Sequence, residues 1–488
     1  MAATRRAPPV TGSRELALIG PELILMVAAL GVLLWHAWET GASLESDAPP
    51  TGVTWLSLAA VVLALAWNAW GGAAGFGFNG MYVRDQVTRM ADLAALVTAG
   101  VAVLLSPGYL TRVRLPAGEF YALILLSTAG AMLMAASGTL VTLFLGLEIL
   151  SFPLYILAGL ARRSRRSQEA GLKYLLLGAF TTAFFAYGIA LVFGATGSID
   201  LRSIAGSPFT PLLGAGVALL TIGLGFEAAL VPFHAWAPDV YEGAPLPVTA
   251  FMSVAAKIGA FAGFLRVFPL ALPHLAAEWS VMLAAIAILT MVLGNLAALF
   301  QTELKRLLAY SGIAHAGYLL IGVASGGAAG IWSVLFYLLV YAGMNLGAFG
   351  VLLLLERQGS EADRLEDLAG LLGRAPWAAI ALAVCMVSLA GLPPTGGFIA
   401  KLYIFRAALG AHQTALALTG VLTSVVSVYY YLRIAYVALT GDPPPAVTLS
   451  HSGFVAAAVA LAIVIVMWLG LFPGDLTAAV QQAGASFR

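Results

Sequence analysis

Five ionisable side chains interrupt apolar stretches that are otherwise long enough to cross a membrane. Two are lysines, Lys257 in TAFMSVAAKIGAFAGFL and Lys401 in TGGFIAKLYIF. Two are glutamates, Glu148 in LVTLFLGLEILSFPLYIL and Glu227 in LLTIGLGFEAALVPFHAW, and the fifth is His315 in LLAYSGIAHAGYLL. An ionised side chain at the bilayer centre costs roughly 2.5–3.5 kcal/mol, so such residues usually face the bundle interior and mark proton or ion routes. We therefore predict that these five residues form a proton relay.

The same residues have less specific interpretations. A buried lysine or glutamate can belong to a structural ion pair, and a lone histidine in a helix most often fills a packing position. Lys257 has about ten residues of apolar sequence on either side, so its amine cannot easily reach the membrane surface. Metal ligands would be grouped at short spacings, whereas the five residues lie on separate segments, which suits stepwise proton transfer. His234, just after Pro232, is a further candidate for the relay.

The elements that carry these residues are apolar runs of about 20 residues, each long enough to cross a hydrocarbon core roughly 30 Å thick. Of the 488 residues, 61% are hydrophobic and only 10% are charged, too few charges to cover a soluble protein of this length. The net charge of +1 gives no global field that would attract nucleic acid. We predict an all-α polytopic membrane protein with about fourteen transmembrane helices in a single domain, residues 1–488. The predicted segments are 17–37, 53–71, 88–107, 119–136, 139–160, 171–194, 210–231, 246–269, 279–300, 307–323, 331–355, 376–407, 413–439 and 453–473.

Two of these segments are interrupted. Segment 376–407 is too long for one plain span and contains the run GLPPTGG, with Lys401 seven residues past its second proline. Segment 210–231 ends at Pro232, five residues after Glu227, and continues as FHAWAPDV. Backbone groups freed at such breaks must be satisfied by protein or water. Broken helices in the two halves of a membrane protein indicate an ion or substrate path.

Basic residues between the segments predict the orientation in the membrane. They concentrate in the loops after odd-numbered segments, which the positive-inside rule places in the cytoplasm, with both termini on the periplasmic side. Three arginines before the first segment argue the other way. Together with the run 16–35 they could form a signal peptide, but no small-residue cleavage site follows, so an uncleaved first helix is favoured. The basic residues of the odd loops are Arg112, Arg114, Arg162, Arg163, Arg165, Arg166, Lys305, Arg306, Arg357, Arg364 and Arg374, against Arg84, Arg89 and Arg202 in the even loops.

Several kinds of chemistry are excluded by the residues present. Cys385 is the only cysteine, so the chain cannot supply an internal disulfide, a CxxC metal site or an iron–sulfur ligand set. Gly75, Gly77 and Gly80 match GxGxxG within GFGFNG, but a dinucleotide site needs a preceding strand and a following helix in a βαβ unit. This match lies in a loop between apolar segments. The polar connection from Glu356 to Pro376 is predicted to be an amphipathic cytoplasmic segment.

The interrupted and charged segments resemble a known family. VPFHAWAPDVYEGAPLPVTAF (231–251), LGLEILSFPLYIL (145–157) and SLAGLPPTGGFIAKLYIF (388–405) are similar to antiporter-like membrane subunits of bacterial NADH–quinone oxidoreductase, respiratory complex I. GNLAALFQTELKRLLAYSGIAHAGYLLIG (294–322) and FYLLVYAGMNLGAF (336–349) extend the likeness over nearly the whole chain. DVYEGAP together with Lys257 favours the subunit N branch, since subunits L and M usually have histidine at the position that corresponds to Lys257.

The resemblance implies a fold and a function. It implies two inverted five-helix repeats, approximately 119–269 and 279–439, with broken helices seven and twelve. It places Glu148, Lys257 and Lys401 on a central hydrophilic axis and His315 near it, in a subunit of the bacterial inner membrane that translocates protons. The partners it implies are other membrane-arm subunits, the lipid bilayer and protons, and no nucleic acid. No cofactor is expected in this chain, while NAD, FMN, iron–sulfur clusters and quinone are expected on partner subunits.

Glu227 departs from the family pattern, which usually has lysine there in a GFK run. In this chain the lysine–glutamate pair of the first half becomes two carboxylates, Glu148 and Glu227. Two nearby carboxylates favour retention of a proton on one of them. Three alternatives therefore stay open: a cation/proton antiporter subunit, a subunit of a membrane-bound hydrogenase, and a structural subunit that has lost pumping.

Overall fold

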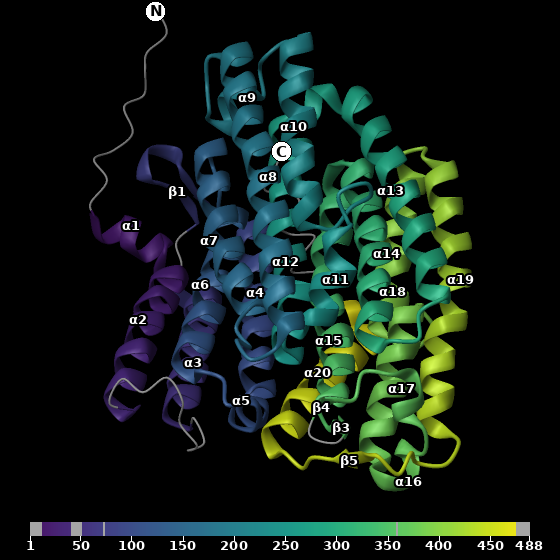
Figure 1. Cartoon of the computed structure of the whole chain (residues 1–488). Coiled ribbons are helices and arrows are strands. Elements are labelled where there is room, and N and C mark those ends of the chain that lie inside the picture. The colour runs from purple at the N-terminus through teal and green to yellow at the C-terminus, as the bar shows by residue number, and fades with distance from the viewer. Residues whose placement is uncertain (1–11, 41–50, 72–73, 358–359, 475–488) are drawn as a thin grey trace, which may run out of the picture.

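The computed structural model describes residues 12–40, 51–71, 74–357 and 360–474. Within these residues, twelve helices are long and apolar enough to cross a membrane, and they run side by side in one bundle (Figure 1). The prediction of a mostly helical, multi-pass membrane protein is confirmed. The long helices are α2 (Gly20–Thr40), α3 (Thr51–Ala66), α4 (Gln86–Leu105), α6 (Ala117–Ala135), α7 (Leu140–Ala158), α8 (Arg165–Thr196), α12 (Leu246–Leu265), α13 (Ala276–Leu299), α14 (Leu304–Ser325), α15 (Gly327–Leu352), α19 (Thr414–Leu439) and α20 (Gly453–Leu471).

Two shorter apolar helices are each followed by a second helix after a break. The first pair is α10 (Pro211–Glu227) and α11 (Trp236–Gly243). The second pair is α17 (Pro376–Ala390) and α18 (Gly396–Gly410). These pairs coincide with the two segments that the sequence predicts to be interrupted. Each predicted apolar segment thus overlaps a helix or a helix pair, while the total of about fourteen crossings stays a prediction.

Short elements lie at the ends of the bundle. β1 and β2 form an antiparallel hairpin, and β4, β3 and β5 form a small antiparallel sheet at the opposite end (Figure 1). GFGFNG thus forms a strand followed by a 3-10 turn rather than the strand and helix of a βαβ unit. The short elements are α1 (Gly12–Leu18), α5 (Pro107–Val113), α9 (Leu201–Ile204), α16 (Leu371–Arg374), β1 (Gly75–Gly77), β2 (Tyr82–Arg84), β3 (Leu355–Arg357), β4 (Ser360–Glu361), β5 (Val447–Leu449), η1 (Trp67–Gly71), η2 (Phe78–Gly80), η3 (Arg266–Ala271), η4 (Pro273–Leu275) and η5 (Leu365–Leu368).

Two helix boundaries differ from the sequence expectation. Helix α8 begins at Arg165, six residues before the predicted apolar run, because Ser164 caps its first turn and a polar first turn still forms a helix. Helix α10 ends at Glu227 rather than near Pro232, because Ala229 adopts a left-handed conformation with φ of 59°. Glu227 is therefore the last residue of its helix, beside the break.

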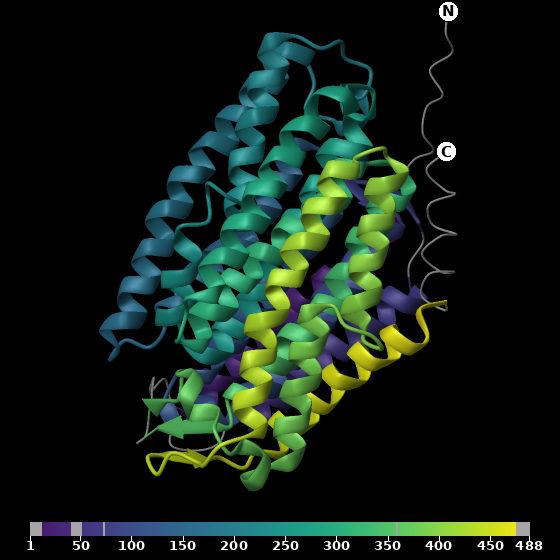
Figure 2. The same ribbon diagram turned by 90° about the vertical axis from the view of Figure 1, so that its right-hand side faces the viewer.

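Helices α12 and α15 form the centre of the bundle. All twenty residues of α12 are buried, and α15 packs against α4, α12, α14, α17, α18 and α20. Helix α20 crosses the bundle obliquely (Figure 2) and packs against α15, α18 and α4, so that the last helix joins early and late parts of the chain. Lys257 on α12, His315 on α14 and Asn345 on α15 are consequently buried.

Glu361 fastens the small sheet to the helices. Its carboxylate accepts hydrogen bonds from Tyr109 Oη at 2.5 Å and from the backbone nitrogen of Leu246, the first residue of α12, at 2.9 Å. Lys305 donates to the other carboxylate oxygen at 2.9 Å. Burial raises the pKa of Glu361, but Lys305 and the hydrogen bonds lower it by more, so the net pKa lies below the ordinary value. Glu361 thus remains ionised and holds the first turn of α12 in place.

The joint between α17 and α18 generates a stability prediction. The ends of the two helices are in close contact at this joint. A Cβ on Gly397 would lie only 1.8 Å from the carbonyl oxygen of Ser388. We expect Gly397→Ala to lower the free energy of unfolding by about 1–3 kcal/mol, because the two helix ends must separate. Thermal unfolding of the purified chain in detergent measures this.

Gly410 is the matched control, since it lies in the same helix and a Cβ there meets nothing within 4 Å. Gly410→Ala should leave the unfolding temperature unchanged or slightly raised. Equal unfolding temperatures for the two variants would contradict the described closure of the joint.

Candidate functional site

The side chain of Lys401 binds the carbonyl groups at the C-terminal end of α17. The helix ends because Gly391 takes a left-handed conformation with φ of 82°, and two prolines follow it. The amine of Lys401, on α18, donates to the carbonyls of Leu389 at 3.1 Å and Ala390 at 2.9 Å. It also contacts Ser424 Oγ on α19 at 2.8 Å. A cation at the C-terminus of a helix is favoured by the helix dipole, so the amine of Lys401 is well placed to satisfy the freed carbonyls.

The break after α10 is satisfied by a different set of groups. The indole nitrogen of Trp236 donates to the carbonyl of Phe226 at 2.9 Å, and the backbone nitrogen of Val231 donates to Thr290 Oγ1 at 3.0 Å. Such contacts are what a helix break within a membrane requires. They leave the side chain of Glu227, beside the break, to interact with other groups.

Glu227 is almost fully buried. Ser151 Oγ on α7 donates to its Oε2 at 3.0 Å, whereas its Oε1 accepts no hydrogen bond from the described residues. The hydroxyl of Tyr174 on α8 is likewise buried without a hydrogen-bond partner among them. Tyr174 stacks on Trp236 with ring centroids 4.2 Å apart, which builds an aromatic wall near the break. A carboxyl in such surroundings needs a proton, a cation or water as its further partner.

Glu148 lies on the same helix as Ser151, one turn earlier. It is half-buried, and Thr182 Oγ1 on α8 donates to its Oε1 at 2.9 Å. Glu148 and Lys257 both lie within range of electrostatic interaction with Glu227. The two carboxylates and the lysine are therefore neighbours in the first half of the chain.

Lys257 lies at the middle of α12 and is almost fully buried. Its amine donates to the carbonyl of Ser253 at 3.2 Å and lies 6.0 Å from the ring centre of Tyr241 and 5.7 Å from that of Tyr341. No salt bridge to Lys257 is found within the described residues. The aromatic faces stabilise a cation only partly, so a charge on this buried amine is weakly compensated by the described residues.

His315 lies between two tyrosine hydroxyls. Its Nδ1 is 2.7 Å from Tyr337 Oη and its Nε2 is 2.9 Å from Tyr431 Oη. Tyr431 also forms a short hydrogen bond with Ser311. An imidazole that accepts a proton on one nitrogen can release one from the other, so this chain of groups across α14, α15 and α19 is suited to proton transfer.

Tyrosine rings fill the intervals between His315 and the two lysines. The ring of Tyr341 is 5.2 Å from the imidazole, and Lys257 lies against its face. The ring of Tyr318 is 5.7 Å from the imidazole, and the amine of Lys401 is 4.9 Å from its centre. We define the central row as Glu148, Glu227, Lys257, His315 and Lys401. The structure places its members as a succession of neighbours across the interior.

The tyrosine and serine hydroxyls that lie beside the central row are not predicted from the sequence. Tyr337 and Tyr341 are four residues apart on α15, a spacing that indicates one helix face, but aromatic residues on an apolar helix are usually packing residues. His234 is half-buried, and its Nδ1 has no hydrogen-bond partner among the described residues. Within the described residues, no hydrogen bond or ion pair joins His234 to the central row. Lys305, predicted as an orientation signal, is buried and bound to Glu361.

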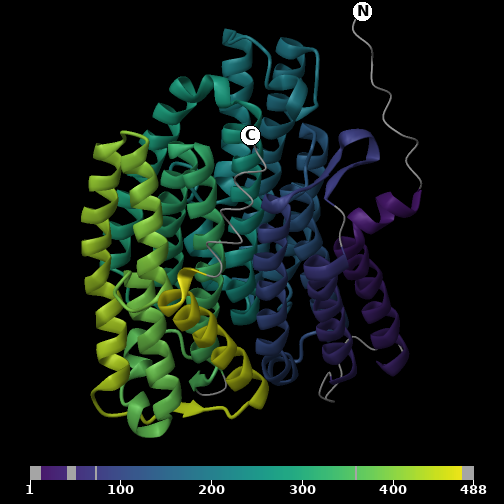
Figure 3. The same cartoon turned by 180° about the vertical axis from the view of Figure 1, so that it is seen from behind.

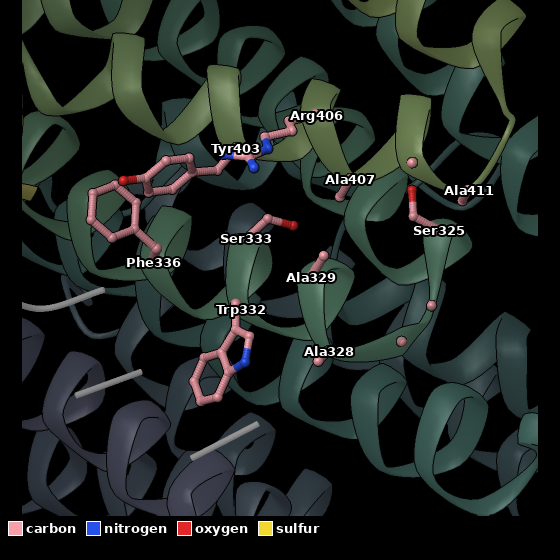
Figure 4. A pocket seen from close by; sticks show the side chains of 13 residues that line it. Ser325, Ala328, Ala329, Trp332, Ser333, Phe336, Tyr403, Arg406, Ala407 and Ala411 are labelled. Carbon is pink, nitrogen blue, oxygen red and sulfur yellow. The ribbon is translucent and has the colours of Figure 1, made fainter. Parts of the chain in front are cut away.

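The cavity in Figure 4 opens elsewhere on the protein. It has a volume of about 580 Å³ and lies between the first turns of α15 and the end of α18, where Arg406 and Tyr403 face Ser333 (Figure 4). It contains no member of the central row. Among the described residues, no group of three or more His, Cys, Asp or Glu side chains could hold a metal ion.

The fold and the row of buried charges define a class of membrane proteins. Residues 137–427 match the family described as NADH:quinone oxidoreductase/Mrp antiporter, TM. The chain belongs to this family of antiporter-like transmembrane proteins.

Relatives within the family are more specific. The chain is 45% identical to NADH-quinone oxidoreductase subunit N of Trichlorobacter lovleyi over 86% of each chain. It is 41% identical to subunit N of Chloroflexus aggregans over 98% of each chain. A chain of respiratory complex I from Thermus thermophilus superimposes with a TM-score of 0.81 at 39% identity, covering 94% of this chain and 99% of that one. These matches confirm the resemblance to subunit N.

Lys257 and Lys305 are two buried lysines that are paired differently, and the difference generates a stability prediction. We expect Lys257→Met to leave the free energy of unfolding unchanged or to raise it by up to about 4 kcal/mol, because an apolar side chain of similar length replaces a poorly paired cation. Lys305→Met should cost about 3–5 kcal/mol, because the buried carboxylate of Glu361 loses its partner.

Chemical or thermal unfolding of the two variants in the same detergent measures the difference. A loss of stability in Lys257→Met as large as that in Lys305→Met would contradict the description of Lys257 as a weakly paired cation.

Proposed function

We propose that this chain is a proton-translocating membrane-arm subunit of a NADH–quinone oxidoreductase in the bacterial inner membrane. Relatives named NADH-quinone oxidoreductase subunit N cover nearly the whole chain. The observation that carries the proposal is the central row itself: buried titratable side chains on five helices, joined by tyrosine rings and hydroxyls. Such an arrangement is costly in an apolar bundle, and proton transfer accounts for that cost.

The proton path within this row follows the contacts. Glu148 and Glu227 hold protons at one end, and Lys257 connects them to the centre of the bundle. His315 receives a proton from one tyrosine hydroxyl and passes one to the other. Lys401 completes the row at the second helix break. Glutamate in place of the family's lysine at position 227 still supplies a proton carrier, so it supports transport rather than a purely structural role.

The energy for transport comes from partner subunits. Moving one charge against the membrane potential costs roughly 2.3 kcal/mol per 100 mV. We infer that other membrane-arm subunits surround this chain, that NAD, FMN, iron–sulfur clusters and quinone are bound by partner subunits, and that both termini lie on the periplasmic side. Arg5, Arg6 and the last fourteen residues lie outside the described residues.

We also infer a single antiporter-like domain with inverted repeats at approximately 119–269 and 279–439. The two broken helices support this division. α10 ends at Glu227 in one half and α17 ends at the carbonyls bound by Lys401 in the other, so each half contributes one break with one titratable side chain beside it. One broken helix in each half supports the proposed inverted repeats.

Replacement of Lys401 tests the relay in the assembled enzyme. We expect Lys401→Ala to slow NADH-driven quinone reduction and to diminish proton pumping together, since removal of one relay member raises the barrier. An increase of about 1.4 kcal/mol corresponds to a tenfold slower turnover. Turnover and vesicle acidification are measured on membranes with equal amounts of assembled enzyme.

Lys173→Ala is the matched control, because Lys173 is a partly exposed lysine paired with Glu169 and Asp239. Surface pairs of this kind contribute at most about 1 kcal/mol, so both rates should be unchanged. Unchanged turnover and pumping in assembled Lys401→Ala would overturn the relay.

A further inference from the structure

A second group of buried charges lies outside the central row, at the end of the bundle that carries the β1–β2 hairpin. The hairpin lies near α1 and the beginning of α2 (Figure 3). Beneath it, Glu22 of α2, Arg84 of β2 and Asp92 of α4 are all buried. We call these three residues the hairpin cluster. None of them belongs to the row proposed to carry protons through the bundle.

Arg84 directs its hydrogen-bond donors away from Asp92. Its Nη1 donates to the carbonyl of Leu18 at 3.1 Å and its Nη2 donates to Asn68 Oδ1 at 2.9 Å. The closest approach to Asp92 is 3.8 Å, an ion-pair distance without a hydrogen bond, and both side chains have no exposed surface. Arg84 thus fixes the hairpin to α1 and η1 and only partly neutralises the acid beside it.

Asp92 is a fully buried carboxyl group without a hydrogen-bond donor. Neither of its oxygens has a hydrogen-bond partner among the described residues, and Glu22 Oε2 has none either. Glu22 Oε1 accepts a hydrogen bond from Tyr82 Oη at 2.7 Å. A buried carboxylate is normally stabilised by several donors, so two acids with three unpaired oxygens beside one arginine cannot both be ionised at low cost.

The neighbouring charges do not supply the missing partner. Arg266, after the end of α12, is committed to Asp85, with distances of 2.5 and 2.8 Å to the two carboxylate oxygens, and also donates to Thr88 and to the carbonyl of Ala135. The other packed helices α3, α15 and α20 contain no charged residue. The only charged residue of α6 is Glu119, at the end of that helix opposite to Ala135. Arg89 of α4 gives no hydrogen bond to either acid, since both oxygens of Asp92 and Oε2 of Glu22 accept none from the described residues and Tyr82 binds the other oxygen of Glu22.

Charge counting then leaves one negative charge in excess. Asp85 and Arg266 neutralise each other, and Arg84 neutralises one of Glu22 and Asp92. We propose that Glu22 and Asp92 hold one exchangeable proton between them, in a closed proton-binding site beneath the hairpin. The O–H bond forms on a carboxylate oxygen of either residue when a hydrated proton arrives, and it breaks when that proton returns to water. No redox change is involved.

The site is independent of the central row. The charged neighbours of Asp92 are Glu22, Arg84, Asp85 and Arg266, none of which belongs to the central row. The hairpin cluster would bind its proton whether or not the central row transports protons. Its position at the hairpin end makes it a proton-holding site near one membrane surface.

Infrared spectroscopy of the full chain in lipid nanodiscs tests the proposal. A protonated carboxylic acid has a carbonyl stretching band that is distinct from carboxylate bands and shifts in D2O. We expect the difference spectrum between the wild type and Asp92→Asn at neutral pH to contain one such band. Asp92→Glu, which keeps a titratable carboxyl, should retain a shifted band, and it also serves if the asparagine variant does not fold.

Asp442→Asn is the control, because Asp442 is exposed and should lose only carboxylate intensity. A folded Asp92→Asn variant that loses carboxylate intensity and no protonated band would overturn the proposal. The proposal would also be overturned if the wild-type carboxylate bands from this site changed when sodium in the buffer was replaced by choline. The cluster would then hold a cation.

Discussion

The hydrogen bonds from Lys401 to the last carbonyls of α17 connect the helix break with the proposed proton path. A helix that stops inside an apolar bundle leaves carbonyl groups that need donors. In this protein a titratable amine provides them. Any change in the protonation of Lys401 therefore alters how well the α17 end is satisfied, and any movement at the joint alters the surroundings of the amine.

The first half of the chain solves the same constraint differently. Trp236 and Thr290 satisfy the backbone at the α10 break, and the side chain beside it is the carboxyl of Glu227. A carboxyl accepts hydrogen bonds when ionised and donates one when protonated. A charged amine, by contrast, donates hydrogen bonds and accepts none. The two breaks thus carry groups of opposite charge, with Lys257 and His315 between them. In the proposed path, each proton transfer changes the charge at one position of the row and thereby the electrostatic surroundings of the next.

The sequence predicts much of this arrangement because charges in apolar runs and prolines at helix breaks are visible without a structure. Lys257, Lys401 and Glu148 are conspicuous for that reason. The tyrosines around His315 could not be predicted, since a tyrosine in an apolar helix usually packs and its hydroxyl partners come from other helices. The end of α10 at Glu227 depends on the left-handed Ala229, which no proline marks. The burial of Asp92 depends on the fold of the hairpin, because a charge so near a segment end would otherwise be expected to reach water.

The central claim is that polar atoms inside the bundle are linked by water and can exchange protons. An electron cryomicroscopy map of the assembled enzyme that resolves ordered waters tests it most directly. We predict waters in contact with the amine of Lys257, with the hydroxyl of Tyr341 and with the free carboxyl oxygen of Glu227. A map in which these three atoms are enclosed by carbon atoms, with no water at any of them, would contradict the account.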